Sequence, residues 1–253
     1  MKKVIVTIMI SLLLMPTCAF AKKKLIFATD SFPPFYYPKN GSPAGIQYEL
    51  AKIVFNRMNT NFKIIFVPWK RALMMAEAGK VDGVFGLRKT KERERWLIYP
   101  EEPLMHITAV IFKHADDPFE YKGISSLAGK TIGITKGYTY GKEFDESSLF
   151  IKEEVSDLHY NFLKLLAGRI DLVAAYRTVG IHTLNEMHIQ DRVTICPEAV
   201  YLSPLYIGFS RKPGNGEISL EFSRILTELK KSDECAEIMR RIGVKPELIS
   251  PCK

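Results

Sequence analysis

One short sequence pattern occurs twice in this chain and constrains its fold more than any other feature. Residues 78–84 read AGKVDGV and residues 167–173 read AGRIDLV, so a helix end, a glycine, a basic residue, a β-branched residue and an aspartate recur in order. A glycine that ends a helix before a strand is common, so either copy alone says little. The recurrence between matched neighbours predicts two homologous α/β lobes.

The residues around each copy predict the content of the lobes. In the first half we expect strands over 24–29, 62–67 and 81–85, with helices over 45–54 and 69–78. Short connections in the order β-α-β-α-β imply a parallel sheet flanked by helices. In the second half we expect strands over 131–135 and 170–175, with a helix over 158–166 between them that Ser156 could cap.

Two further β-rich segments, residues 107–112 and 200–209, are where we expect the chain to cross between the lobes. A chain that leaves one lobe, builds a second and returns needs two such crossings. We therefore predict a first lobe from residues 22–109 and a second from 110–200. The return over 201–253 adds two C-terminal helices to the first lobe.

The first 21 residues have the pattern of a secretory signal peptide. Lys2 and Lys3 precede an apolar run over residues 4–15, and Ala19 and Ala21 place small residues before a cut after position 21. The run is shorter than the roughly 20 residues that a membrane-spanning helix needs. We expect export to the periplasm with removal of this segment. Cys18 leaves a lipid-anchored form open.

The composition narrows the class of protein and its partners. Hydrophobic residues make up 47% of the chain and charged residues 25%, which excludes a disordered, collagen-like or polytopic membrane protein. The net charge of +8 comes from basic residues scattered along the sequence. Because they form no arginine-rich block interleaved with aromatic residues, we do not expect nucleic acid as a partner.

Export also predicts one disulfide among the three cysteines that follow the signal peptide. Cys235 and Cys252 are the closest pair in sequence, and a bridge between them would contribute about 3 kcal/mol. Cys196 would then be free. No cysteine stands beside a candidate base or in a glycine-rich turn, so we do not expect a catalytic thiol.

Several motifs, taken together and in order, resemble one family. Besides the signal peptide and the GKVDG of residues 79–83, these are FPPF at 32–35, GIxxEL at 45–50, TxxR at 90–93 and the segment 99–103. The chain resembles the family 3 extracellular solute-binding proteins, the polar amino-acid-binding components of bacterial ABC importers. The resemblance implies a type II periplasmic-binding-protein fold, in which two α/β lobes joined by two crossover strands close on a ligand in a central cleft. It also implies a monomer that delivers its ligand to an ABC permease.

The residues that would line such a cleft can be named from the sequence. In open α/β sheets, ligands bind beyond the carboxyl ends of the strands. The turns at those ends contain two arginines, several aromatic residues, hydroxyls and glycines, which suits an anionic or zwitterionic small molecule. The candidate ligand-binding residues are Asp30, Phe32, Trp69, Gly86, Arg88, Arg93, Tyr138, Thr139, Tyr176 and Arg177.

The resemblance gives some of these candidates particular roles. Arg93 matches, by the Thr-x-x-Arg spacing, the family residue that grips the α-carboxylate of the ligand, and Phe32 matches the aromatic residue that packs on it. Tyr138 and Thr139 stand where the second lobe presents hydrogen-bond donors. From the residues alone, alternatives stay open: a solvated arginine in a charge-dense run, core rings at Phe32 and Trp69, and a plain surface turn.

Two departures from the family pattern bear on the ligand. The first lobe of the family offers a small hydroxyl residue shortly before the carboxylate-binding arginine, and here that position is Arg88. In amino-acid binders the strand after Gly-Arg-x-Asp ends in an acid that accepts the ammonium group of the ligand, and here it leads to Tyr176 and Arg177. Unless Asp30 or another acid substitutes, these changes favour a more anionic ligand or a role other than amino-acid import.

Two other functions remain to be weighed. Periplasmic cyclohexadienyl dehydratases resemble these binders and employ a carboxylate of the second lobe, but the chain has Ala-Tyr-Arg at that strand end. It has no Ser-His-Asp, His-Glu-x-x-His or Cys-x-x-Cys pattern, and its five histidines lack metal-ligand spacing. We therefore expect no catalytic residues, metal or cofactor. A protein that presents its bound ligand to a signalling receptor is the third possibility.

Overall fold

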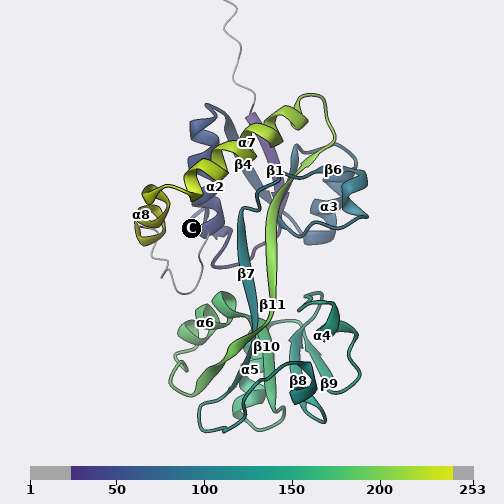
Figure 1. The fold of residues 1–253 in the computed structure, drawn as a ribbon. Coiled ribbons are helices and arrows are strands. Elements are labelled where there is room, and N and C mark those ends of the chain that lie inside the picture. Colours follow the sequence, from purple (N-terminus) through teal and green to yellow (C-terminus); the bar gives the residue numbers. More distant parts are fainter. Residues whose placement is uncertain (1–23, 242–253) are drawn as a thin grey trace, which may run out of the picture.

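The computed structural model describes residues 24–241, which form two lobes stacked end to end (Figure 1). Two long strands, β7 (Met105–His114) and β11 (Val193–Ser210), lie antiparallel beside each other and run from one lobe into the other. Two α/β lobes joined by two crossing strands are the architecture that the sequence predicts. The predicted lobe limits, at residues 109 and 200, fall inside these two strands and stay a prediction.

The first lobe, at the top of Figure 1, contains the N-terminal elements and the C-terminal helices. Its strands are β1 (Lys24–Thr29), β4 (Asn61–Phe66), β5 (Gly83–Leu87) and β6 (Leu97–Ile98), with a small hairpin of β2 (Tyr37–Lys39) and β3 (Ser42–Ala44). Its helices are α2 (Ile46–Arg57), α3 (Trp69–Glu77), α7 (Asn215–Lys230) and α8 (Asp233–Arg241).

The second lobe, at the bottom of Figure 1, is built from the middle of the chain. Its strands are β8 (Thr131–Thr135), β9 (Ile151–Val155) and β10 (Leu172–Tyr176), and its helices are α4 (Lys142–Glu146), α5 (Leu158–Leu166) and α6 (Arg177–Glu186). The sequence missed α4, β9 and α6. It placed the helix cap at Ser156, whereas the side chain of Asp157 accepts the hydrogen bond from the His159 N–H.

The strands of both lobes form one path, in the order β4-β1-β5-β11-β7-β10-β8-β9. Within each lobe the strands that the sequence identified pair in parallel, β1 with β4 and β5, and β8 with β10. The parallel pairing predicted for the first-half strands is confirmed, and the crossing strands β7 and β11 add antiparallel pairs with β10 and β5. Direct strand pairing makes the crossings part of both lobes.

The repeated aspartate has the same role in both lobes. In the first lobe the Asp82 carboxylate accepts from the backbone N–H of Ile26 at 2.9 Å, and the N–H of Asp82 donates to the Ile26 carbonyl at 2.7 Å. In the second lobe Asp171 and Thr131 exchange the same two bonds, at 2.7 and 2.9 Å. Each aspartate therefore ties the turn before its strand to the first strand of its lobe, which explains why the motif recurs.

Phenylalanine rings fill the first lobe between the sheet and helices α2 and α7. The ring centroid of Phe27 on β1 lies 5.6 Å from that of Phe55 on α2 and 5.5 Å from that of Phe209 on β11. Phe55 also lies 5.0 Å from Phe222 on α7, and all four side chains are fully buried. Such ring pairs add about 0.5–1.5 kcal/mol each beyond burial. They attach the C-terminal helix α7 to the first lobe.

Some of the sequence predictions fall wholly or partly outside residues 24–241. The predicted signal peptide and Cys18 lie there, and so does Cys252, the predicted partner of Cys235. Cys235 is disulfide-bonded, and Cys196 is a buried free thiol; the pairing of Cys235 with Cys252 stays a prediction. Within the described range, no helix has both the length and the apolar character needed to cross a membrane.

Candidate functional site

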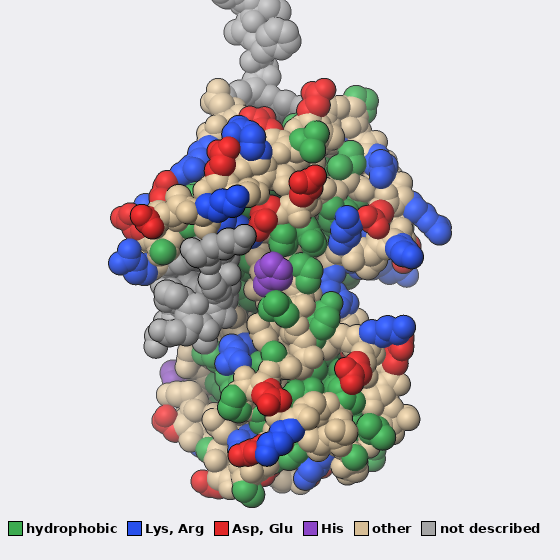
Figure 2. Space-filling view, viewed as in Figure 1, with side chains coloured by type: hydrophobic (Ala, Val, Ile, Leu, Met, Phe, Trp, Pro, Cys, Tyr) green, Lys and Arg blue, Asp and Glu red, His purple; other side chains and the backbone are tan. Residues whose placement is uncertain are grey.

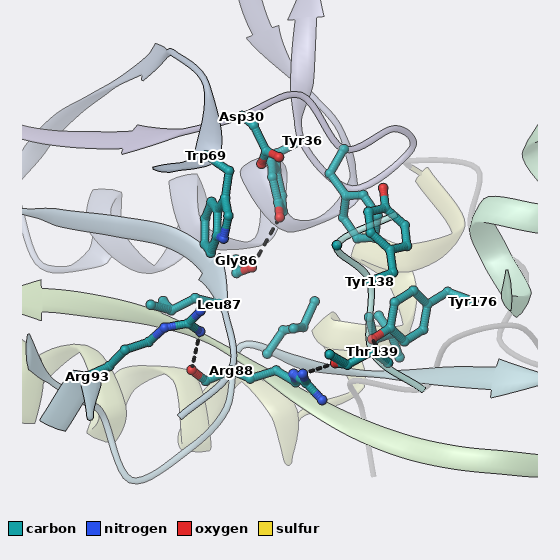
Figure 3. A pocket seen from close by; sticks show the side chains of 14 residues that line it. Asp30, Tyr36, Trp69, Gly86, Leu87, Arg88, Arg93, Tyr138, Thr139 and Tyr176 are labelled. Carbon is teal, nitrogen blue, oxygen red and sulfur yellow. Dashed lines mark hydrogen bonds between the residues drawn. The ribbon is translucent and has the colours of Figure 1, made fainter. Parts of the chain in front are cut away.

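A cavity of about 150 Å³ lies between the two lobes, at the carboxyl ends of β1, β5, β8 and β10. Nine of the ten predicted ligand-binding residues line it, and Figure 3 shows their side chains converging from both sides. The exception is Arg177, which begins α6 and donates from Nη2 to the Pro197 carbonyl at 3.4 Å. The remaining lining residues are Tyr36, Leu87, Ile107, Gly137 and Leu205.

A tight turn after β1 places the first aromatic side chains in the cavity. The N–H groups of Phe35 and Tyr36 both donate to the Phe32 carbonyl, at 2.8 and 3.1 Å. The Tyr36 hydroxyl reaches across to the Gly86 carbonyl at 3.1 Å (Figure 3). Gly86 has a φ of 70°, and a Cβ there would lie 2.2 Å from the Tyr36 ring, so only glycine fits at the end of β5.

Arg93 is held beside the cavity by three contacts. The Thr90 hydroxyl accepts from the Arg93 backbone N–H at 3.2 Å, which explains the Thr-x-x-Arg spacing. The guanidinium donates from Nη1 to the Arg88 carbonyl at 3.1 Å and lies 5.6 Å from the centroid of the Trp69 ring. Burial lowers the pKa of Arg93 from its ordinary value, although a guanidinium stays protonated in proteins.

Within residues 24–241, neither arginine of the cavity has an acidic partner. Among residues 24–241, neither Arg88 nor Arg93 forms a salt bridge to an aspartate or glutamate, whereas nearby Lys89 pairs with Glu94 at 3.0 Å. A half-buried cation gains most from a partner of opposite charge. The arrangement can therefore bind an anionic group, and two guanidinium groups suit a carboxylate.

The two lobes touch each other across the cavity. The Arg88 guanidinium donates to the hydroxyl of Thr139, which comes from the loop after β8 in the second lobe. The ring centroid of Phe32 lies 5.7 Å from that of Tyr138 and 6.2 Å from that of Tyr176. The first lobe thus contributes charged groups, and the second closes over them with rings and a hydroxyl.

The tyrosine hydroxyls of the cavity are neutral. Burial raises the pKa of Tyr36, Tyr138 and Tyr176, and the nearby carboxylate of Asp30 raises those of Tyr36 and Tyr138 further. The Tyr176 hydroxyl donates to the Thr139 carbonyl at 2.8 Å. Burial also raises the pKa of Asp30 itself, and within the described chain no cation pairs with it. Tyr176 consequently does not replace the negative charge that the family pattern expects at its position.

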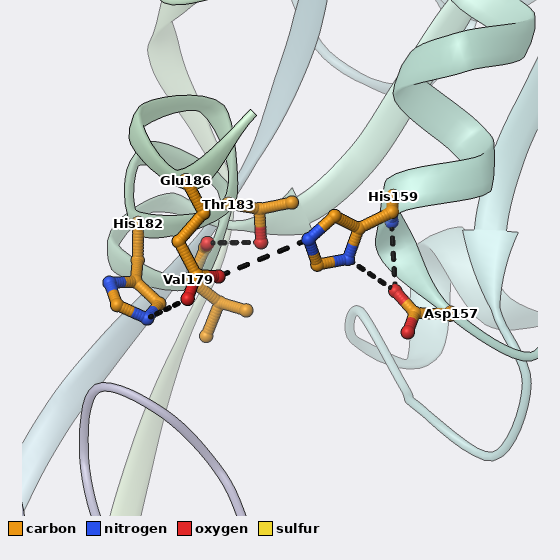
Figure 4. Close-up of polar contacts among 6 residues, drawn as sticks. All are labelled: Asp157, His159, Val179, His182, Thr183 and Glu186. Atoms are coloured by element: carbon orange, nitrogen blue, oxygen red, sulfur yellow. Dashed lines mark hydrogen bonds and ion pairs between the residues drawn. The ribbon is translucent and has the colours of Figure 1, made fainter. Parts of the chain in front are cut away.

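A second polar cluster lies away from the cavity, between α5 and α6 (Figure 4). His159 Nδ1 lies 2.7 Å from the Asp157 carboxylate, while His159 and His182 face the Glu186 carboxylate at 3.9 and 3.6 Å. In the described part of the chain, no three His, Cys, Asp or Glu side chains are grouped to hold a metal ion. The cluster connects two helices at the surface, where such ion pairs contribute little to stability.

Comparison with known proteins identifies the family. The model of the bacterial extracellular solute-binding proteins, family 3, matches residues 25–245, nearly the whole chain. This chain is a family 3 extracellular solute-binding protein. Solved structures agree on the type II periplasmic-binding-protein fold: holo ArgBP from T. maritima matches with a TM-score of 0.65 at 22% identity, covering 87% of this chain and 96% of that one. The predicted family and fold class are confirmed.

The individual proteins that match this chain have low sequence identity to it. The octopine-binding periplasmic protein of Rhizobium meliloti is 24% identical over 89% of this chain and 79% of its own length. The membrane-bound lytic murein transglycosylase F of Desulfosudis oleivorans is 21% identical over 86% of this chain, but the match spans only 48% of that enzyme. A histidine kinase sensor domain matches with a TM-score of 0.70 at 18% identity, over 89% of this chain and 99% of that domain.

Sequence reasoning missed five residues that line the cavity, for two different reasons. Leu87, Ile107 and Leu205 are apolar strand residues, and nothing in the sequence separates them from the core. Tyr36 and Gly137 carried a usable signal, because both stand in turns that follow predicted strands.

Proposed function

We propose that this family 3 protein captures a small carboxylate-bearing ligand in the periplasm by closing its two lobes around it, and delivers it to an ABC permease. The observation that carries the proposal is the pair Arg88 and Arg93, two guanidinium groups without an acidic partner in the described chain, in a cavity walled by aromatic rings. A bidentate arginine–carboxylate pair combines charge with a matching geometry. The octopine-binding periplasmic protein among its relatives supports the transport role.

The size of the cavity limits the ligand. A volume of about 150 Å³ is below the roughly 300–1,000 Å³ of pockets for drug-sized molecules. A cavity of about this volume accommodates a single benzene ring. The proposed ligand is therefore of amino-acid size, and it is enclosed when the Arg88–Thr139 contact forms between the lobes.

The test compares two neighbouring arginines with calorimetry, after a thermal-shift screen of amino acids, dicarboxylates and small peptides. Arg93→Ala should weaken binding by about 2–4 kcal/mol, because a buried carboxylate loses its partner. Arg93→Lys should also bind poorly, since an ammonium cannot replace a bidentate guanidinium. Arg95, which is exposed on the same 3₁₀ turn, is the control.

The outcomes separate the carboxylate site from a merely charged surface. Without ligand, the melting temperature of Arg93→Ala should stay close to that of the parent, because a half-exposed arginine contributes little to folding. Equal and small losses of affinity for Arg93→Ala and Arg95→Ala would mean that the charged run is only a solvated face.

The sensor-domain structure favours one second candidate, a protein that presents its bound ligand to a signalling receptor. Both candidates use the same cavity, so ligand binding does not distinguish them. Uptake of the ligand identified by the screen does: a strain lacking this chain should lose uptake if it feeds a permease. Unchanged uptake together with a lost transcriptional response would favour signalling.

A further inference from the structure

Three aromatic rings form a corner on one side of the cavity. The ring centroids of Phe32, Tyr138 and Tyr176 lie 5.7, 6.2 and 6.2 Å from one another, close to an equilateral triangle. The plane of Phe32 is nearly perpendicular to those of both tyrosines, at 80° and 86°. A group placed over this triangle can lie within about 6 Å of all three ring centroids, the range in which a cation is attracted to ring faces.

Two tyrosine hydroxyls near this corner are already engaged. The Tyr176 hydroxyl donates to the Thr139 carbonyl, and the Tyr36 hydroxyl donates to the Gly86 carbonyl. These bonds fix the two rings from opposite lobes. With their hydroxyls engaged, Tyr36 and Tyr176 offer the cavity ring surface, which attracts positive charge without requiring N–H donors.

A carboxylate stands beside the same corner. Asp30 interacts electrostatically with Tyr36 and Tyr138, and no other described residue forms an ion pair with it. In Figure 3, Asp30 lies at the opposite side of the cavity from Arg88 and Arg93. The arginines thus lie on one side of the cavity and Asp30 on the other. The ring corner lies between them, because Tyr138 interacts electrostatically with Asp30, whereas Tyr176 interacts with Arg88.

We infer that the ligand is a zwitterion whose carboxylate faces the arginines and whose positive end is a methylated ammonium group held by Asp30 and the corner of Phe32, Tyr138 and Tyr176. This inference rests on the proposed function and specifies its ligand class. A primary ammonium has three N–H donors, and at this end Asp30 is the charged acceptor that the cavity offers. A trimethylammonium group has no N–H to satisfy and presents its charge to ring faces.

Matched ligands test this chemistry by calorimetry on the mature protein. The probes are N,N,N-trimethylglycine, glycine and 3,3-dimethylbutanoate, the last having the shape of the first without the positive charge. γ-Butyrobetaine and γ-aminobutyrate form a longer pair, which covers a different spacing of the two charges. We expect a trimethylated ligand to bind at least about tenfold tighter than its amine, and trimethylglycine likewise tighter than 3,3-dimethylbutanoate.

Variants test whether the aromatic corner causes the preference for a trimethylated ligand. Tyr138→Leu should weaken binding of the trimethylated ligand about tenfold and that of 3,3-dimethylbutanoate by less, because the uncharged probe loses only apolar contact. Tyr138→Phe should keep the preference because it keeps the ring. Tyr160→Leu is the matched control, because Tyr160 on α5 is 56% exposed and does not line the cavity.

The results also separate this inference from the carboxylate site. If carboxylates bind in an Arg93-dependent manner but methylation brings no gain at either length, the methylated-ammonium inference is wrong and the proposed function stands. Equal binding of trimethylglycine and 3,3-dimethylbutanoate would likewise overturn it, since shape alone would then explain the affinity. If none of the screened carboxylates binds, both proposals fail.

Discussion

The two lobes contribute differently to the cavity between them. Every charged side chain that lines it, Asp30, Arg88 and Arg93, comes from the first lobe, whereas the loops and strand end of the second lobe supply Tyr138, Thr139 and Tyr176, all uncharged. Under the proposed function, the first lobe would supply the charged partners of both ends of a zwitterion. Closure by the second lobe would then exclude water, which strengthens such charge interactions.

The repeated aspartates of the two lobes make the same hydrogen bonds but differ in burial. Asp82 and Asp171 make the same pair of backbone bonds, yet Asp82 is 5% exposed and also accepts from Lys212 Nζ at 2.7 Å, whereas Asp171 is exposed. Lys212 belongs to the chain that has returned to the first lobe along β11. The aspartate of the first lobe is thus covered by the returning C-terminal segment, whereas the aspartate of the second lobe is not.

On both lobes, basic and acidic side chains are interspersed over the face seen in Figure 2. Arg88 and Arg93 of the cavity, which form no salt bridge within the described chain, contrast with this mixed surface. The functional asymmetry between the lobes therefore lies in the cavity and does not follow the overall charge of +8.

The largest expected difference between the lobes is in the loss of stability when a cavity glycine is replaced by alanine. Gly86 of the first lobe and Gly137 of the second both have a positive φ. Gly86→Ala should destabilise the protein by about 3 kcal/mol or more, because the Cβ would lie 2.2 Å from the Tyr36 ring, which packs between Phe32 and Phe85. Gly137→Ala meets no atom within 4 Å and should cost only the backbone strain of about 1 kcal/mol. Urea unfolding of the ligand-free protein measures both, and a similar loss for the two would show that Tyr36 moves aside.

The next difference concerns the repeated aspartates. Asp82→Ala should cost about 2–3 kcal/mol, because it leaves the half-buried ammonium group of Lys212 and the Ile26 N–H without their partner. Asp171→Ala should cost about 1 kcal/mol or less, since water can reach the Thr131 N–H there. Asp82→Asn, which keeps an acceptor but removes the charge, should fall between them. Equal costs in thermal unfolding would contradict a role for Lys212.

How much of this the sequence could reveal depends on whether a property is local. The Gly-basic-β-branched-Asp pattern predicted two lobes because Asp82 and Asp171 serve local backbone bonds that any copy of the unit needs. The pairing of Asp82 with Lys212 was not predictable, because 130 residues separate the two in sequence. The antiparallel pairing of the two crossing strands was not predictable for the same reason, because it is set by the return of the chain along β11.

The residues of the cavity likewise divide into those that local sequence predicts and those that it does not. Turn residues such as Arg88 and Thr139 could be named because ligand sites lie at strand ends, but their contact across the cleft depends on the closure of the lobes. The wall residues Leu87 and Leu205 are ordinary strand residues in sequence, and only the packing of the lobes brings them to the cavity. Arg177 was misplaced because its strand end begins α6, which turns the side chain toward Pro197.

The smallest expected effect concerns Asp30 of the first lobe and Asp157 of the second. Their pKa values are shifted in opposite directions, so their contributions to stability change with pH in opposite directions. Burial raises the pKa of Asp30, so the native protein binds the proton more tightly than the unfolded chain; this stabilisation is full below the unfolded pKa and is lost as the pH rises through the folded pKa. Burial acts the same way on Asp157, but the hydrogen bonds from His159 outweigh it and lower the pKa of Asp157. Its stabilisation is therefore present at neutral pH and is lost as the pH falls through the folded pKa.

Neutral variants of these two residues should consequently behave in opposite ways. At neutral pH, Asp30→Asn should raise the melting temperature of the ligand-free protein, because it removes a charge that burial disfavours, and the gain should shrink on acidification. Asp157→Asn should lower it, because asparagine keeps the helix cap but loses the charge that the His159 contacts favour. Melting curves recorded from acid to neutral pH test both. A loss of stability in Asp30→Asn at neutral pH would mean that a cation of the protein already pairs with Asp30, and the positive end of the ligand would then have to be sought elsewhere in the cavity.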